Sequence, residues 1–264
     1  MSRPIVFLTD YGHHDPFVGI CHGVIARIAP EVRVIDLTHA VPRQDVLRGA
    51  VELARSIPYM PTEAVFVAVV DPGVGSDRRE VALSAGASAL VGPDNGVLSL
   101  AAETLGGVDA AVEISNEEVV LSPVSRTFHG RDVFAPAAAH LAAGMPLDEL
   151  GPTVDPSSLQ RLELPRPMVA VGAVGARVTV TDGFGNVQTN ATEHDLEDAG
   201  VAGGRVLVVN GRRLPRAGTF AELPEREPGI IVDSDGYLAI VVNHGNAATA
   251  LGLAAGDAVI VESG

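Results

Sequence analysis

The feature that most restricts how this chain can fold is a change of hydrophobic pattern near Leu150. Before it, short β-rich runs alternate with stretches of helical period; residues 4–9 are typical of a strand and residues 15–30 of a helix. After it, helical period is scarce, and short strands are separated by Asp-Gly, Asn-Gly and Gly-Asp turn signals. The two parts therefore predict domains of different class.

Strands that alternate with helices predict an α/β N-terminal domain, residues 1–160, with a largely parallel sheet flanked by helices. The later strands predict a smaller all-β C-terminal domain, residues 168–264, mostly antiparallel and either a barrel or a sandwich. A proline-bearing, linker-like stretch lies between them. A length of 264 residues suits either one large domain or two, so the division rests on the pattern and not on the length.

Composition excludes several classes of function. A net charge of −15 argues against a nucleic-acid partner and is compatible with a cationic ligand. The absence of lysine excludes Schiff-base chemistry and the phosphate-loop lysine, and the single cysteine, Cys21, excludes a multi-cysteine zinc site. The apolar runs fall short of the roughly 20 residues that span a bilayer, and the N-terminal stretch lacks a signal-peptide pattern. We therefore expect a cytoplasmic protein without a membrane segment.

Polar residues follow several of the expected strands of the first domain. Asp10, His39 and Asp71 each come directly after a β-rich run. Ligands of open α/β sheets bind beyond the carboxyl ends of the strands, which makes these residues candidates for a site. Each aspartate equally fits a residue that caps a turn or a helix.

Two loops carry the sharper candidates. In "DPGVGSDRR", Asp71 enters a glycine-rich loop that leads to Arg78, and an arginine beside a carboxylate holds it ionised and oriented. The glycine spacing matches neither the dinucleotide fingerprint nor the Walker A motif. In "TFHGRD", His129 precedes Gly130, which allows a ligand to approach the backbone closely. Taken alone, His129 also fits a structural loop histidine.

The second domain begins with "VTDGFGNVQTN", which has two interpretations. Asp182, Phe184 and Asn186 form either a turn with a packed aromatic ring, or a carboxylate, a stacking ring and an amide for a nucleobase. The chain has only 4% aromatic residues and no tryptophan, which slightly favours a specific use of Phe184.

A cluster of histidines near Asp10 raises the alternative of a metal site. His13, His14 and His22 are close in sequence, but no H-x-x-x-H or H-E-x-x-H spacing is present. Adjacent histidines also point in different directions on most backbones. We therefore expect no metal ligands here, and keep a metal-dependent hydrolase as a minor alternative.

Seven segments taken in order resemble the S-adenosyl-L-methionine hydroxide adenosyltransferase family, which is related to the fluorinase and chlorinase enzymes. They are "FLTDYGHHDPFVG", "VIDLTHAVPRQDV", "VVDPGVGSDRR", "GPDNG", "TFHGRD", "DGFGNVQTN" and "DSDGYLAIVVNHGNAATALGL", and they cover essentially the whole chain. The resemblance implies a two-domain protein with an α/β N-terminal domain and an all-β, barrel-like C-terminal domain. It also implies a homotrimer that binds its substrate between one subunit's N-terminal domain and its neighbour's C-terminal domain. It implies cleavage of S-adenosylmethionine (SAM) with water to adenosine and L-methionine, without a cofactor.

The resemblance also implies roles for individual residues. The family's catalytic Asp–Arg–His set corresponds to Asp71, Arg78 and His129; Arg78 is preferred to Arg79 because it lies seven residues after the aspartate. The implied substrate-binding residues are Asp10 at the ribose diol, Asp15, Asp182 and Ser234 at the methionine end or ribose, and Phe184, Asn186 and Phe220 at the adenine.

The chain departs from the halide-using relatives at two places. Those relatives carry a tyrosine–serine pair where this chain has His129 and Gly130, so the serine hydroxyl that would hold a halide is missing. Asp235 stands where they carry an arginine that helps to hold the methionine carboxylate. A chlorinase-like 5′-halo-5′-deoxyadenosine synthase and a non-catalytic adenosine or SAM binding module are the alternatives.

The chemistry of the implied reaction suits these residues. The sulfonium leaves as a neutral thioether, so no general acid is required. Water needs a base, and histidine has a suitable ordinary pKa near 6.5. Arg78 would stabilise developing hydroxide and orient Asp71, and either His129 or Asp71 would accept the proton.

Overall fold

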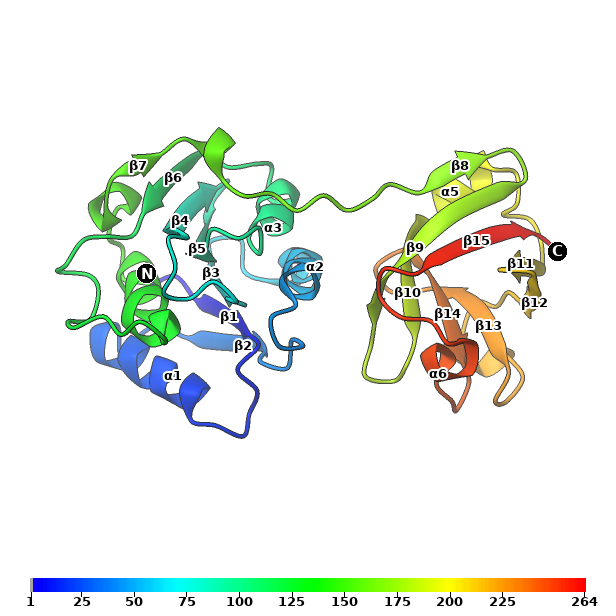
Figure 1. Cartoon of the computed structure of the whole chain (residues 1–264), viewed down its shortest axis with the longest axis horizontal. Helices are drawn as coiled ribbons and strands as arrows, with labels where there is room; N and C mark the ends of the chain where they lie inside the picture. Colours follow the sequence, from blue (N-terminus) through cyan, green and yellow to red (C-terminus); the bar gives the residue numbers. More distant parts are fainter. Residues whose placement is uncertain (1) are drawn as a thin grey trace. The chain divides into compact units, whose positions relative to one another are not determined.

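The computed structural model describes residues 2–264 and divides into two compact units. Residues up to Leu162 form the first unit, and Glu163–Gly264 form the second (Figure 1). Within the described residues, no helix combines the length and the apolar character that crossing a membrane requires.

The first unit is built on a seven-stranded sheet. Its strands are β1 (Ile5–Thr9), β2 (Val34–Thr38), β3 (Val65–Val69), β4 (Glu80–Ala85), β5 (Ser88–Pro93), β6 (Ala110–Glu113) and β7 (Thr153–Val154). They lie in the order β2-β1-β3-β5-β4-β6-β7. The neighbours β2, β1, β3 and β5 are parallel, whereas β4, β6 and β7 join through antiparallel pairs. The sheet is therefore mixed, and the expectation of a largely parallel sheet holds only for its first four strands.

The antiparallel part of the sheet has a local cause. Only Gly86 and Ala87 connect β4 to β5, and Gly86 has a φ of +54°. A two-residue connection can join only antiparallel neighbours, because a parallel pair needs a crossover of a dozen residues or more. The pattern "EVALSA" of β4 is short and only partly alternating, and the sequence did not predict this strand.

Helices cover both faces of the sheet. They are α1 (Phe17–Ile28), α2 (Val46–Ser56), α3 (Ser99–Thr104) and α4 (Ala135–Ala142), with single helical turns at Ile57–Tyr59, Leu147–Leu150 and Pro156–Ser158 and a π-helical turn at Gly130–Phe134. Along β1, Ile5 and Phe7 pack on the side of α1 and α4, and Val6 and Leu8 pack on the side of α2 and α3. Successive residues of a strand face opposite sides, so a strand buried on both faces is a continuous apolar run.

The connections define where a ligand can bind. Helix α1 joins β1 to β2 over one face, and α2 joins β2 to β3 over the other, so the strand order reverses between β1 and β3. In open α/β sheets, the crevice at such a reversal, beyond the carboxyl ends of the strands, is where ligands bind. Asp10 follows β1 and Asp71 closely follows β3, so both lie at this edge.

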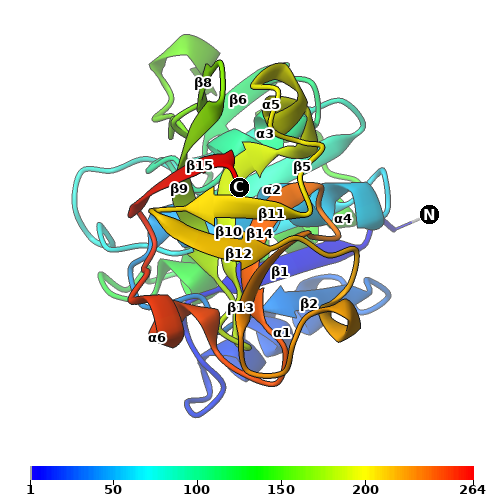
Figure 2. The same ribbon diagram turned by 90° about the vertical axis from the view of Figure 1, so that its right-hand side faces the viewer.

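The second unit is an antiparallel sheet with two short helices. Its elements are β8 (Met168–Ala170), β9 (Ala173–Thr181), β10 (Val187–Thr192), α5 (Glu193–Asp198), β11 (Val206–Val209), β12 (Arg212–Pro215), a helical turn at Phe220–Glu222, β13 (Pro228–Val232), β14 (Tyr237–Val242), α6 (Ala247–Leu251) and β15 (Ala258–Ser263). The order is β12-β11-β15-β9-β10-β14-β13, with β8 beside β9. Figure 2 faces this unit and shows α5 and α6 on opposite sides of it.

The second sheet nearly closes on itself. An isolated bridge between Arg216, just after β12, and Ile230 of β13 joins its two edges. The inner face holds Val187, Leu207 and Ile240, all fully buried. The barrel-like expectation therefore holds for the sheet, while α5 and α6 make the unit more than purely β.

Candidate active site

Three residues from two distant loops meet beyond β3. The Arg78 guanidinium makes a two-pronged contact with Asp71: Nε donates to Oδ1 at 2.9 Å, and Nη2 donates to Oδ2. The same Nη2 lies 3.1 Å from Nδ1 of His129, although 51 residues separate the two in sequence. Their side chains are only 7–10% exposed. The structure therefore brings together the predicted Asp71, Arg78 and His129.

Glu80 completes this cluster, and sequence reasoning missed it. Its Oε1 lies 2.7 Å from His129 Nδ1. The same oxygen is 2.9 Å from Arg78 Nη1, an ion pair without hydrogen-bond geometry. Arg78 and Glu80 lie two apart in an extended segment and face the same side, while Arg79 faces away and pairs with Asp94. This alternation is the signal that could have identified Glu80.

A cavity opens beside the cluster, at the reversal between β1 and β3. Asp10 and Tyr11 line it from the end of β1, Asp71 from the loop after β3, and Phe128 and His129 from the third loop. Burial raises the pKa of Tyr11 well above its usual range, with smaller contributions from nearby anionic groups, so its hydroxyl stays protonated. The cavity thus combines apolar walls with carboxylates at one end.

The loop that carries His129 is held by its own polar residues. The Asp132 carboxylate accepts hydrogen bonds from Arg131 Nε at 2.6 Å and from the backbone N–H of Ser125 at 2.9 Å. Ser125 Oγ in turn accepts the Phe128 N–H at 3.1 Å. The π-helical turn starts directly after His129, and such turns are frequent at functional sites. These contacts fix the backbone that presents the imidazole.

Glycines allow the loops to approach each other. Gly75 has a φ of +76°, and a Cβ atom there would collide with the carbonyl oxygen of Arg126. A Cβ atom at Gly130 would collide with the Tyr11 hydroxyl. A side chain at position 130 would therefore require Tyr11 to move, in addition to any need for space around a ligand.

The other expected residues of the first unit differ in position. Asp10 lines the cavity, and its Oδ2 accepts the Gln44 N–H at 2.8 Å. Asp15 is exposed in the loop before α1 and does not line the cavity. The alternative metal cluster of His13, His14 and His22 is not formed among the described residues. His22 instead lies beside Asp36 and His39.

The adenine-side candidates meet in a hollow of the second unit. Phe184, Asn186 and Phe220 line an open depression together with His244. The Phe184 ring is 81% exposed, which leaves its face available for stacking. Phe184 and Asn186 are close in sequence, whereas Phe220 is distant from both and is brought to them by the fold of the unit.

Asp182 and Ser234 are placed differently. The Asp182 carboxylate already accepts three hydrogen bonds: the N–H groups of Phe184 and Asn186, each at 2.9 Å, and the Asn186 side-chain amide at 2.8 Å. It therefore shapes its own turn, as in the first of the two sequence interpretations, but the Phe184 ring of that turn is exposed and not packed. Ser234 is exposed in the turn between β13 and β14 and does not line the hollow.

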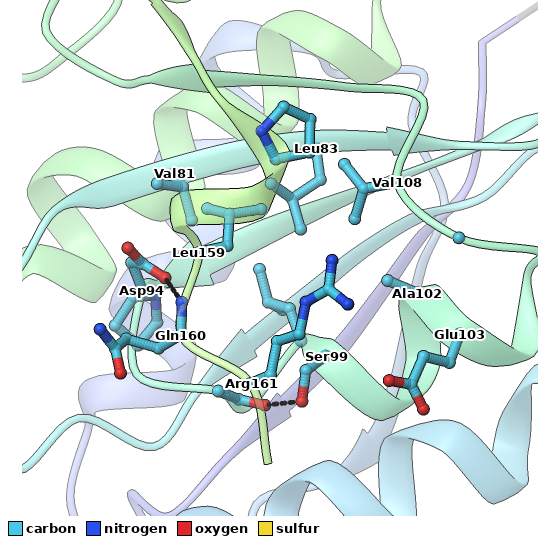
Figure 3. Close-up of a pocket in the computed structure, with 15 residues that line it drawn as sticks. Val81, Leu83, Asp94, Ser99, Ala102, Glu103, Val108, Leu159, Gln160 and Arg161 are labelled. Carbon is cyan, nitrogen blue, oxygen red and sulfur yellow. Dashed lines mark hydrogen bonds between the residues drawn. The ribbon is translucent and has the colours of Figure 1, made fainter. Parts of the chain in front are cut away.

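A further cavity lies elsewhere in the first unit (Figure 3). Leu83, Val108 and Leu159 give it apolar walls. Asp94 and Glu103 supply two carboxylates, of which Asp94 accepts the Gln160 N–H at 2.8 Å and pairs with Arg79. None of the predicted site residues lines this cavity, so the candidate active site is the one beside Asp71, Arg78 and His129.

Comparisons with known proteins agree with this division of the chain. Residues 5–151 match the SAM hydroxide adenosyltransferase N-terminal domain, and residues 176–260 match the C-terminal domain of the same family. The chain is 51% identical to a Salinispora arenicola protein named (R)-S-adenosyl-L-methionine hydrolase, over 98% of both chains. It is 31% identical to an Actinoplanes protein named fluorinase, over 98% of both chains.

A solved structure gives the same result for the fold. An uncharacterized conserved protein from Thermotoga maritima superposes with a TM-score of 0.89 and 36% identity, covering 97% of this chain and 99% of that one. Both parts of the family model match in order, and together they span most of the chain. The chain therefore belongs to the SAM hydroxide adenosyltransferase family.

Proposed function

We propose that this protein hydrolyses (R)-S-adenosyl-L-methionine to adenosine and L-methionine by attack of water at C5′. The observation that carries the proposal is the Asp71–Arg78–His129 cluster with Glu80, beside a cavity at the reversal of strand order. Membership of the family and the similarity to proteins named as hydrolases of this substrate support it.

The charges at the cavity suit a cationic substrate. Asp10, Asp71 and Glu80 bring three carboxylates to this edge of the sheet, and the Arg78 guanidinium pairs with two of them, Asp71 and Glu80. An excess of negative charge in a cleft attracts a sulfonium cation and stabilises it on binding. In this proposal Asp10, at the carboxyl end of β1, accepts hydrogen bonds from the ribose hydroxyls.

The reaction proceeds by displacement in line with the C5′–S bond. A lone pair of the water oxygen forms the new C5′–O bond, and the electrons of the C5′–S bond leave with sulfur as the neutral thioether of methionine. The water loses one proton to a base, so the products are adenosine, methionine and one proton. Placement of the trapped water contributes to the rate by proximity, and general-base catalysis contributes roughly 10²–10⁴-fold.

His129 is the base in this proposal because of what holds its Nδ1. This nitrogen either donates to Glu80 Oε1 at 2.7 Å or accepts from Arg78 Nη2 at 3.1 Å. Arg78 Nη2 already donates to Asp71, and the Glu80 carboxylate is closer to His129 Nδ1 than Arg78 is. We therefore assign the proton of the imidazole to Nδ1. Nε2 is then unprotonated and can take a proton from water.

Arg78 acts on the attacking oxygen and on Asp71. Its positive charge would stabilise developing hydroxide in this proposal, while its Nη1 is buried and makes an ion pair with Glu80 Oε1 at 2.9 Å. Asp71 holds the guanidinium through two parallel contacts, which fix its plane. Asp71 thus positions Arg78, and His129 takes the proton.

The second unit supplies the adenine side of the site in this proposal. Phe184 stacks on the base, Asn186 pairs with its edge, and Phe220 closes the hollow. The proposed enzyme is a homotrimer in which this hollow of one subunit meets the cavity of a neighbour, with Asp15, Asp182 and Ser234 near the methionine end or ribose. Light scattering after size-exclusion chromatography tests the trimer; a monomer with full activity contradicts the shared site.

Halide chemistry is disfavoured by the Tyr11 contact. A serine in place of Gly130 would put its Cβ atom into the Tyr11 hydroxyl, so the present packing has no room for that halide ligand. The comparison with a protein named fluorinase is also more distant, at 31% identity, than the comparison with the named hydrolase, at 51%.

A product assay in ¹⁸O-labelled water tests the proposal directly. Chelator-treated protein is incubated with the substrate, with and without chloride, and the products are separated by chromatography with mass detection. Adenosine with ¹⁸O at its 5′-hydroxyl, formed in equal amount to methionine, is the expected result. A chlorinated nucleoside, activity only after addition of a divalent metal, or binding without turnover would each overturn it in favour of one alternative.

The variant His129→Ala tests the assigned base. A loss of kcat of roughly 10²–10⁴-fold is expected, which is the usual contribution of a general base. The matched control is His140→Ala, because His140 lies on α4 and does not line the cavity. An unchanged kcat for His129→Ala would show that another group accepts the proton.

A further inference from the structure

Three side chains from separate segments converge beside β2, an edge strand of the first sheet. His22 lies on α1, Asp36 on β2, and His39 directly after β2. His22 Nε2 is 2.8 Å from Asp36 Oδ1, and His39 Nε2 is 3.0 Å from the same oxygen. All three potential ligand atoms lie within 4.8 Å of one another. The two imidazoles thus point their Nε2 atoms at one carboxylate oxygen.

We propose that His22, Asp36 and His39 form a binding site for a divalent transition metal, with Zn²⁺ as the best match. Two imidazole nitrogens and one carboxylate oxygen are a donor set that Zn²⁺ accepts, with a fourth position left for water. At bond lengths of about 2.05 Å, the ligands of a tetrahedral zinc ion stand about 3.3 Å apart. The distances from Asp36 Oδ1 to His22 Nε2, 2.8 Å, and to His39 Nε2, 3.0 Å, are shorter than this by about half an ångström or less.

To hold an ion, the three ligand atoms must move slightly apart, and the exposed side chains of the cluster can make this movement. The Asp36 side chain is 43% exposed and the His22 side chain 34%, so both can rotate without disturbing the core. His39 is 1% exposed and provides the fixed ligand. One rigid and two adjustable ligands allow the site to adapt its geometry to the ion.

The buried ligand is oriented by a second layer of contacts. His39 Nδ1 lies 2.9 Å from Thr9 Oγ1, and the edge of the ring meets Phe7 at a centroid distance of 4.9 Å. To bind a metal through Nε2, the imidazole must carry its proton on Nδ1, and the Thr9 oxygen can accept that proton in a hydrogen bond. Metal-binding histidines usually have such a partner at the other ring nitrogen.

The proposed metal site is distinct from the catalytic cluster in its residues. Thr9, which orients His39, precedes Asp10 directly, and the His39 carbonyl accepts the Gly12 N–H at 2.7 Å. A bound ion would therefore tie α1 to β2 beside the loop that carries Asp10. No step of the proposed hydrolysis involves this ion.

Titration of the whole chain with Zn²⁺ by calorimetry, and with Co²⁺ by visible absorption, tests the proposal. The expected result is one saturable ion per chain and the absorption bands of tetrahedral Co²⁺. His22→Ala should weaken the affinity by about 100-fold or more, since loss of a second-layer partner alone costs 10–100-fold. Asp36→Asn should have a similar effect, and both changes lie on the exposed side, where folding is not at risk.

A histidine in the second unit provides the matched control. His194 on α5 is 78% exposed and lies near Glu197 and Asp198, so it represents adventitious binding at a surface. His194→Ala should leave the high-affinity ion in place. Absence of saturable binding, binding that survives His22→Ala, or binding lost in His194→Ala would each overturn the proposal. Circular dichroism of each variant confirms that the fold is retained.

Discussion

The contact between Glu80 and His129 yields the sharpest test of the proposed mechanism. Replacement of Glu80 by Gln keeps the size of the side chain and removes its charge. The 2.7 Å contact with Nδ1 then loses its ionised acceptor, and the amide group can donate to Nδ1 instead. The proton of the imidazole would move to Nε2, where it blocks acceptance of a proton from water.

The size of the effect follows from the burial of the pair. Glu80 is 20% exposed and the His129 side chain 10%, so solvent screens this contact only weakly. Hydrogen bonds to charged groups contribute about 1.5–3 kcal/mol. At about 1.4 kcal/mol for each factor of ten, this corresponds to a loss of kcat of roughly 10- to 150-fold. KM should change little, because Glu80 does not line the cavity.

The assay is steady-state formation of adenosine over a range of substrate concentrations. Glu52→Gln on α2 is the matched control, since it makes the same chemical change at a pair with Arg48 at 2.5 Å that does not touch the cavity. Glu80→Asp should recover part of kcat. A Glu80→Gln enzyme with kcat within about twofold of the wild type would refute the positioning role, as would a change confined to KM.

Three further changes test other parts of the structure. Phe184→Ala should raise KM by about 5- to 150-fold with kcat largely kept, because stacking on a base contributes about 1–3 kcal/mol; Tyr59→Ala, 69% exposed in the first unit, is the control in the same kinetic assay. Gly130→Ser should lower the free energy of unfolding by about 1–3 kcal/mol through the clash with Tyr11, without any chlorinated product, as urea denaturation and chromatography would show. Asp132→Asn should lower stability by about 2 kcal/mol at neutral pH. Burial acts to raise the pKa of Asp132, but the hydrogen bonds that the carboxylate accepts outweigh burial and lower the pKa. The contribution of Asp132 to stability is therefore present above about pH 4 and is lost as pH falls through the lowered pKa. The melting temperatures of the wild type and of Asp132→Asn should converge at acid pH, and a difference that stays constant with pH would contradict this.

Site residues that stand in short sequence motifs could be predicted, whereas residues that reach the site only through long-range packing could not. Asp71 and His129 stand in short motifs with recognisable neighbours, so their proximity could be predicted, while their catalytic roles stay predictions. Glu80 could not be found in this way, since it begins a strand, β4, whose alternation is weak. The convergence of His22 with Asp36 depends on how α1 packs over β2, and helical period alone does not specify that contact.

The fold shows the same limit in physical terms. Buried parallel strands such as β1 are continuous apolar runs and are easily recognised. The turn at Gly86 and Ala87 lacks the Asn-Gly or Asp-Gly pair of a typical hairpin, so the antiparallel half of the sheet was not predicted. The nearly closed second sheet depends on one bridge between Arg216 and Ile230, a long-range pairing that short patterns do not encode.

The Tyr11 hydroxyl that rests against Gly130 constrains how proteins of this family can diverge. A serine gained at position 130 is harmful while Tyr11 keeps its place, and a smaller residue gained at position 11 leaves a void while Gly130 is present. Each substitution is thus unfavourable alone and acceptable with the other, which is reciprocal sign epistasis. In this chain the combined substitution of both positions is therefore expected to cost less stability than the sum of the two single substitutions.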